Sequence, residues 1–203
     1  MMVRHGGTTA GADHFAGSTD VPLSDEGCKQ AAALAERLAP IHFDAMYSSD
    51  LRRAMQTAEA IVARQNPGDT VRPLPELREI AHGHWENLSI DEVKRRFPDE
   101  YANYESDPLR RAPAGGETGQ SVLARALPAM KQIVADHAGQ TILLVSHKAT
   151  IRLVLCGLLG VDPARYRDRF RQDLACLNIL HFRTSDDAQL VLLNDTSHYS
   201  KIR

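Results

Sequence analysis

The segment from Thr141 to Ser146 contains four successive large aliphatic residues, Ile142 to Val145, and its length suits a strand. Apolar residues at successive positions, instead of alternate ones, are typical of a strand that is covered on both faces. Five other segments are also predicted to be strands: 1–3, 43–47, 71–74, 176–182 and 189–193. Because segments with helical spacing alternate with these strands, the sequence predicts an α/β fold, a three-layer sandwich in which helices flank a mostly parallel sheet.

Five segments with apolar residues at helical spacing lie between these strands: 25–39, 51–61, 89–104, 117–137 and 150–159. Ser24 offers an N-cap to the first helix, and residues 48–50 offer capping oxygens to the second. Pro98 interrupts the third helix, and Pro128 is expected to kink or divide the fourth. Gly160 is the expected C-cap of the fifth helix.

Length and charge limit the number of domains and the class of partner. With 203 residues, of which 43% are hydrophobic, the chain is long enough for one sizeable core, and we expect a single domain over 1–203. A net charge of -2 gives no overall attraction to nucleic acid or to an anionic membrane. No apolar run approaches the roughly 20 residues of a membrane span. Without a basic-then-apolar leader, and with cysteines in no CxxC spacing, a cytoplasmic location is expected.

Arginine and histidine side chains follow two of the predicted strands directly. Arg4 and His5 come after the strand at 1–3, and His147 comes after the strand at 141–146. A guanidinium presents a rigid fork of donors that fits phosphate, and an imidazole with an unprotonated nitrogen can attack phosphorus. Since the carboxyl ends of parallel strands meet at one edge of a sheet, these three side chains are expected to lie together.

Two more residues fit the same chemistry. Arg53 lies near the start of a predicted helix, and Glu79 follows a predicted strand by a few residues. Phosphoryl transfer depends on fixed cations that meet the charge of the phosphoryl oxygens, and the leaving oxygen needs a proton donor. The adjacent Arg52 competes with Arg53 for the role of cation, because helix geometry alone does not choose between them. Glu76 and Glu86 compete with Glu79 for the role of acid.

These positions belong to a series of motifs that runs over most of the chain: Arg4-His5-Gly6 with Thr8, Thr19-Asp20-Val21-Pro22-Leu23-Ser24 with Gly27 and Gln30-Ala31, Ser48-Ser49-Asp50-Leu51 with Arg53-Ala54 and Thr57-Ala58, Leu77 with Glu79, Gly83 with Trp85-Glu86, Gly115-Gly116-Glu117, and Val145-Ser146-His147. In this order the motifs resemble the histidine phosphatase superfamily, also called the phosphoglycerate mutase-like family. The segment 79–85 and the ending around His198 are most similar to its metal-independent phosphoserine phosphatase and broad-specificity branches.

The resemblance implies a role for each of the five catalytic candidates. His5 would be the nucleophile that becomes phosphorylated, and Arg4 and Arg53 would clamp the phosphate. His147 would donate a hydrogen bond to the phosphoryl oxygens, and Glu79 would act first as general acid and then as base for water. His5 must present a neutral nitrogen, so we expect a backbone carbonyl to accept its other N–H.

Five residues are candidates for substrate binding: Thr8, Gly17, His82, Lys148 and His198. His82 is a candidate for contact with the organic part of the substrate, and His198 belongs to a terminal segment that in relatives folds over the site. Lys148 stands where a glycine is frequent in the family. Its ammonium group either lies near the phosphate or points to solvent.

The His82-x-His84 spacing could also serve a metal ion, which would make the protein a metallohydrolase. Two arginines in the same pocket would repel a divalent cation. We therefore expect no metal ligands and no cofactor.

Together these features predict a metal-independent phosphomonoester hydrolase, a histidine acid-type phosphatase whose partner is a small phosphorylated metabolite, with phosphoserine as one candidate. Residues 81–115 would form a cap-like insertion over the site, shorter than a mutase needs to hold its intermediate against water. A cofactor-dependent phosphoglycerate mutase is the alternative within the family. A non-catalytic phosphate-binding or regulatory protein is another, because Gly7, Gly11 and Ala16 stand where relatives often carry polar side chains. Whether the chain forms a homodimer stays open.

Overall fold

A computed structural model describes residues 1–10 and 13–199 of the chain, so Gly11 lies outside the described residues. Six strands form one sheet in the order β3-β2-β4-β1-β5-β6. Their bounds are β1 Met2–Arg4, β2 Ala45–Ser48, β3 Val71–Pro73, β4 Ile142–Ser146, β5 Leu177–Thr184 and β6 Asp187–Asp195. The pairs β3-β2, β2-β4 and β4-β1 are parallel, whereas β1-β5 and β5-β6 are antiparallel. The predicted α/β fold is thus confirmed, with a mixed sheet.

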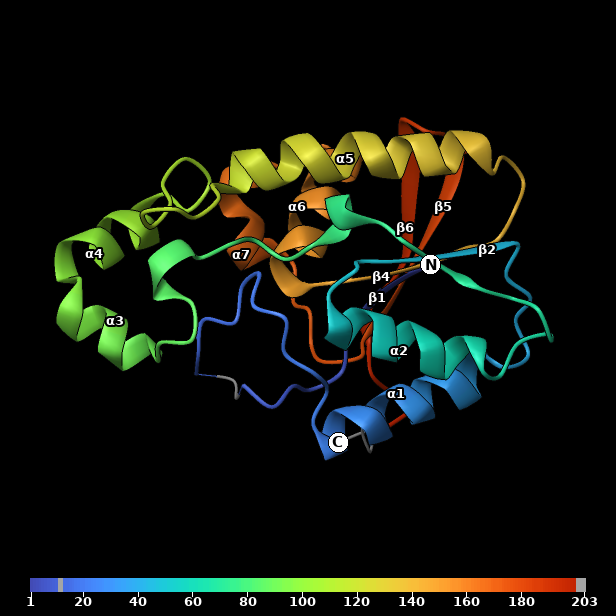
Figure 1. The fold of residues 1–203 in the computed structure, drawn as a ribbon. Coiled ribbons are helices and arrows are strands. Elements are labelled where there is room, and N and C mark those ends of the chain that lie inside the picture. The colour runs from blue at the N-terminus through green and yellow to red at the C-terminus, as the bar shows by residue number, and fades with distance from the viewer. Residues whose placement is uncertain (11–12, 200–203) are drawn as a thin grey trace.

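Strand β4 lies between β2 and β1, and each of its residues is buried. Leu143 and Val145 pack into the core formed with α1 and α2, whereas Ile142 and Leu144 pack into the core formed with α5 and α6. The helices accordingly cover both faces of the sheet (Figure 1). This two-sided cover is the physical reason for the uniformly apolar sequence of β4.

Seven α-helices are present among the described residues: α1 Asp25–Leu38, α2 Arg52–Val62, α3 Ile90–Arg96, α4 Pro98–Ser106, α5 Gly119–Asp136, α6 Lys148–Leu159 and α7 Tyr166–Arg169. Ser24 caps α1 by accepting a hydrogen bond from the Gly27 amide, as predicted. Gly160 ends α6 with a φ of 65°, also as predicted. The short helix α7 was not predicted.

The expected caps at the start of α2 are wrong, and of the two effects expected of Pro128 in α5, a kink or a division, the division is absent. No side chain of residues 48–50 caps α2, because its N-cap is Leu51; instead the Asp20 carboxylate accepts from the Arg52 amide at 2.6 Å. Helix α5 continues through Pro128 without a division. Its buried face, with Val122 and Met130 packed in the core, holds the helix together where the proline lacks an amide donor.

The parallel register brings three loops together at the carboxyl edge of the sheet. Arg4 pairs with Ser146 across β1 and β4, and the His5 amide donates to the Ser146 carbonyl at 3.1 Å. The Ser49 amide donates to the Val145 carbonyl at 2.9 Å. The residues that follow β1, β2 and β4 are therefore neighbours, as expected for parallel strands.

Residues 81–115 leave the sandwich as a separate lobe that carries α3 and α4 and stands to one side (Figure 1). The lobe has a small core of its own, in which Trp85, Val93 and Tyr104 are buried. At its base the Glu117 amide donates to the Ala81 carbonyl at 2.9 Å, and the Ala81 amide donates to Glu117 Oε2 at 3.0 Å. This reciprocal pair of hydrogen bonds joins the two segments of the chain that lead into and out of the lobe.

Within the described part of the chain, no helix combines the length and the hydropathy that crossing a bilayer requires.

Candidate active site

A cavity of about 840 Å³ opens at the carboxyl edge of the sheet. Eight of the ten predicted site residues line it: Arg4, His5, Thr8, Gly17, Arg53, Glu79, His82 and Lys148. They come from β1 and its following loop, from α2, from the segment before the lobe, from the lobe itself and from the start of α6. Of the predicted residues, only His147 and His198 do not line this cavity.

His5 is 6% exposed, and its Nδ1 lies 2.7 Å from the Gly6 carbonyl oxygen. A carbonyl only accepts, so Nδ1 carries the hydrogen and Nε2 is left as the nitrogen with a free electron pair. Burial, followed by the charges of Arg4 and Arg53, holds the pKa of His5 well below its usual value. The imidazole is therefore neutral, as a nucleophile must be.

Arg4 is held by its own strand and by one carbonyl contact. Its Nη1 donates to the Gln172 carbonyl oxygen at 2.7 Å, while its Nε is buried and has no hydrogen-bond partner in the structure. A buried donor without a partner is costly, and a guanidinium stays charged even when burial lowers its pKa. This arrangement provides a fixed positive charge for an anion in the cavity.

The two neighbouring arginines of α2 lie in different environments. Arg53 is 2% exposed, whereas Arg52 is exposed to solvent. Arg53 donates to the Thr19 carbonyl at 2.8 Å and to the Gly17 carbonyl at 2.7 Å, so its guanidinium is fixed against the loop that lines the cavity. The structure thus places Arg53, and not Arg52, in the cavity.

The loop that Arg53 contacts is fastened to the lobe by Glu86. The Glu86 carboxylate accepts from the Ser18 amide at 2.8 Å, from the Ser18 hydroxyl at 2.7 Å and from the Thr19 hydroxyl at 2.6 Å. Burial alone would raise the pKa of Glu86, but these hydrogen bonds hold it below its usual value. Glu86 is therefore an ionised anchor that shapes the loop.

Glu79 is the one carboxylate among the three acid candidates that lines the cavity. Its two carboxylate oxygens accept from the first turn of α6, at 3.2 Å from the Thr150 amide and 3.2 Å from the Ala149 amide. Arg125 of α5 donates to the Glu79 carbonyl at 3.2 Å and forms an ion pair with Glu117. Backbone and side chain of Glu79 are thus held from two helices.

His147 is fully buried beside His5 and is not one of the residues that line the cavity. The two ring centroids are 4.9 Å apart, and His147 Nε2 lies 2.8 Å from the Ser49 hydroxyl. Its Nδ1 is buried without a hydrogen-bond partner in the structure. Burial, followed by the charge of Arg53 and by His5, holds the pKa of His147 well below its usual value, so this ring is neutral as well.

His198 also differs from its expected place. It does not line the cavity; its ring packs against Tyr199 at 5.0 Å between centroids, and its Nδ1 lies 3.4 Å from Arg37 of α1. The next residue, Tyr199, lines the cavity instead, and its hydroxyl donates to the Leu174 carbonyl. The terminal segment thus reaches the cavity through Thr196 and Tyr199, and not through His198.

Several residues of the site were not predicted. Gln30 of α1 accepts from the Gly7 amide at 2.9 Å, and Thr57 of α2 accepts from the Gly6 amide at 3.2 Å. Both side chains are buried on otherwise apolar helix faces, at 8% and 0% exposure. A polar residue on the apolar face of a predicted helix is the signal that could have indicated them, since buried polar groups need partners.

The His82-x-His84 pair does not converge on one point. His82 packs edge-on against Phe15 and Tyr104, whereas His84 Nε2 lies 2.8 Å from the Glu100 carboxylate. Among the residues that the structure describes, no group of three or more histidine, cysteine, aspartate or glutamate side chains is arranged to hold a metal ion.

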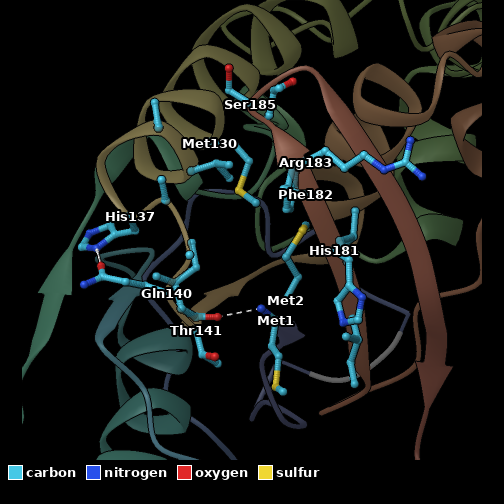
Figure 2. A pocket seen from close by; sticks show the side chains of 18 residues that line it. Met1, Met2, Met130, His137, Gln140, Thr141, His181, Phe182, Arg183 and Ser185 are labelled. Carbon is cyan, nitrogen blue, oxygen red and sulfur yellow. Dashed lines mark hydrogen bonds between the residues drawn. The ribbon is translucent and has the colours of Figure 1, made fainter.

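A second cavity of about 380 Å³ lies at the opposite end of the sheet, around the start of β1 and β4 (Figure 2). Met1, Met130 and Phe182 are among its lining residues, and the amino group of Met1 donates to the Ile142 carbonyl at 2.6 Å. None of the predicted site residues lines it. The predicted site residues that line either of these two cavities therefore all line the larger one.

Comparison with known proteins places this site in a family. The model of the histidine phosphatase superfamily (branch 1) matches residues 1–196. Phosphoserine phosphatase 1 of Hydrogenobacter thermophilus is 31% identical over 201 residues, which are 98% of this chain and 92% of the relative.

Solved structures agree with this match. Bacillus stearothermophilus YhfR superposes with a TM-score of 0.90 at 27% identity and covers 97% of this chain and 96% of its own. Mycobacterial glucosyl-3-phosphoglycerate phosphatase in complex with VO3 superposes with a TM-score of 0.85 at 30% identity, covering 95% and 96% respectively. The chain belongs to the histidine phosphatase superfamily. Family membership and the phosphatase names of the relatives support phosphatase activity.

Proposed function

We propose that the protein is a phosphomonoester hydrolase that works through a phosphohistidine at His5. One observation carries this proposal: a neutral imidazole, with its Nδ1 hydrogen held by the Gly6 carbonyl, lines one cavity together with the guanidinium groups of Arg4 and Arg53. Arg4 and Arg53 supply the fixed positive charge that the phosphoryl oxygens require in the transition state.

The reaction consists of two displacements at phosphorus. First His5 Nε2 forms a bond to phosphorus, the ester P–O bond breaks, and Glu79 donates a proton to the leaving alkoxide. Then Glu79 removes a proton from water, the water oxygen attacks phosphorus, and the P–N bond breaks to release inorganic phosphate and regenerate His5. His147 Nδ1, which is buried beside His5 and lacks a partner, is the group proposed to hydrogen-bond to a phosphoryl oxygen.

Small phosphorylated metabolites are the proposed substrates, with phosphoserine as one candidate. A cavity of about 840 Å³ is in the range that holds a small molecule. Relatives named phosphoserine phosphatase support this class, as do those named glucosyl-3-phosphoglycerate phosphatase. The protein is proposed to work without a metal ion and in the cytoplasm.

Turnover of p-nitrophenyl phosphate by the wild-type protein and by His5→Ala tests the proposal. The variant should lose more than about 1,000-fold in kcat, because it lacks the imidazole that is proposed to attack phosphorus. Acid quenching of the wild type during turnover should trap an acid-labile phosphoryl group that the variant lacks. His42→Ala, which changes an exposed histidine outside the cavity, is the control. Undiminished turnover by His5→Ala, or loss of wild-type activity on exhaustive chelation, would contradict the proposal.

A further inference from the structure

Lys148 is the first residue of α6, and its side chain lines the cavity beside Arg4 and Glu79. Within the described residues, no carboxylate lies within ion-pair distance of its ammonium group, and no hydrogen bond to the side chain is recorded. A lysine facing a cavity with no partner has its charge available for a ligand.

The other basic groups that line the cavity are engaged. Arg53 donates to two carbonyls of the loop 17–19, and Arg4 donates to the Gln172 carbonyl. Arg171 forms an ion pair with Asp173 at 2.8 Å. Lys148 therefore differs from its neighbours, because nothing within the described chain neutralises or holds its charge.

Lys148 and Arg53 come from different elements of the cavity wall, because Lys148 begins α6 and Arg53 lies in the first turn of α2. Besides burial, the charges of Arg152 and Arg4 lower the pKa of Lys148, while Glu79 and Asp173 act in the opposite direction. The charges of Glu79, Asp20 and Glu86 raise the pKa of Arg53, and the charge of Arg4 lowers it. Arg4 and Glu79 are thus common to both surroundings, and Lys148 lies on the side of α6 and the 171–174 segment.

The charge of the cavity exceeds what a phosphate monoester requires. Arg4 and Arg53 match the two negative charges of the phosphate dianion. Arg171 and Asp173 neutralise each other, Glu26 lies 3.9 Å from Lys29, and Glu79 holds the proton that it donates as the proposed general acid, so Lys148 is left with one positive charge. A compact ammonium with three donors suits one singly charged group.

Given the proposed hydrolase function, we propose that Lys148 is a specificity-determining residue that binds a carboxylate on the organic part of the substrate. The preferred substrates are then phosphate esters of small hydroxy acids or amino acids, whose carboxylate lies a few bonds from the phosphate. Esters of neutral alcohols lack this contact.

Two esters that differ only at this group provide the test. 3-Phosphoglycerate has a carboxylate where glycerol 3-phosphate has a neutral CH2OH group. Each is measured as a competitive inhibitor of p-nitrophenyl phosphate hydrolysis, so the readout does not depend on its own turnover. The wild-type protein should bind 3-phosphoglycerate about tenfold more tightly, since one hydrogen-bonded charge pair typically contributes a factor of this size.

Substitutions at Lys148 should change the ratio of the two inhibition constants. Lys148→Met should bring the ratio close to one, Lys148→Glu should invert it, and Lys148→Arg should keep a preference for the acid. Lys131→Met is the matched control, because Lys131 pairs with Asp186 away from the cavity and its loss should leave the ratio unchanged.

Two results would overturn the role of Lys148. If Lys148→Met weakens the binding of both esters equally, the ammonium group contacts the phosphate. If it weakens the binding of neither ester, the side chain points to solvent. Both are distinct from failure of the proposed function, which would appear as wild-type protein that does not hydrolyse p-nitrophenyl phosphate at all.

Discussion

At the scale of single residues, the site depends on side chains whose polar atoms are fixed before any substrate arrives. Gly6 sets the tautomer of His5, two loop carbonyls orient Arg53, and Glu86 holds the loop that supplies those carbonyls. Donors that are already oriented toward developing charge cost no rearrangement during the reaction. The charge of Arg53 and its planar geometry are therefore both expected to matter.

The pair Arg52 and Arg53 provides a test at this scale. Arg53→Lys keeps the charge but replaces Nη1 and Nη2, which donate separately to the Thr19 and Gly17 carbonyls, by a single ammonium nitrogen. We expect kcat/KM for p-nitrophenyl phosphate to fall about 100-fold. Arg52→Lys, on the exposed side of the same helix turn, should change it by no more than about twofold. Equal effects in steady-state assays of the two variants would contradict the assigned geometry.

At the scale of elements, the position of the loop that follows His5, with Gly6 and Gly7, depends on the close approach of α1. A Cβ atom added to Gly27 would lie 1.9 Å from the Gly7 carbonyl oxygen, and one added to Gly6 would lie 2.5 Å from the Gly27 carbonyl oxygen. Both contacts are with backbone, which cannot rotate away. The first turn of α1 thus rests directly on the residues that follow His5.

Gly27→Ala should therefore destabilise the protein and displace the loop. Forcing a methyl group into a filled space typically costs about 1–3 kcal/mol, and urea unfolding monitored by circular dichroism measures the loss. Gly7→Ala is the control for stability, because its Cβ would meet the Ser24 hydroxyl oxygen at an ordinary 3.4 Å. That control should change stability by less than about 1 kcal/mol. Wild-type stability of Gly27→Ala would show that α1 has room to move.

At the scale of the whole molecule, the folded chain buries two histidines at the carboxyl edge of the sheet. His5 and His147 are neutral and buried where three strands, α2 and α6 meet. Burial and neighbouring arginines lower the pKa of each ring, whereas both rings regain their ordinary pKa near 6.5 when the chain unfolds. Below that pH the unfolded chain binds protons that the folded protein does not bind.

Stability should accordingly fall as the pH decreases below about 6.5. Each fully neutral buried histidine adds up to about 1.4 kcal/mol of lost stability per pH unit. Urea unfolding at pH 7.5, 6.5 and 5.5 should show a shallower decline for His147→Gln than for the wild type. His42→Gln, a change at an exposed histidine, is the control. A decline that is equally steep in His147→Gln would contradict a neutral buried ring.

The sequence by itself determined the layers of this fold and the edge where the site lies. Uniform apolarity in β4 specified a strand covered on both faces, and the positions of Arg4, His5 and His147 directly after strands specified a shared edge. Both features are local, because they depend on which residue follows which along one element. The cap at Ser24 and the C-cap at Gly160 are local for the same reason.

Only the tertiary structure decided which side chains reach the cavity. Helix geometry alone did not distinguish Arg52 from Arg53, and the contacts of Arg53 with the loop 17–19 fix its guanidinium at the cavity. Likewise Asp20 caps α2 from a distant loop, and Tyr199 takes the place expected for His198. Each outcome depends on contacts between segments far apart in the chain, which the pattern of any one segment does not contain.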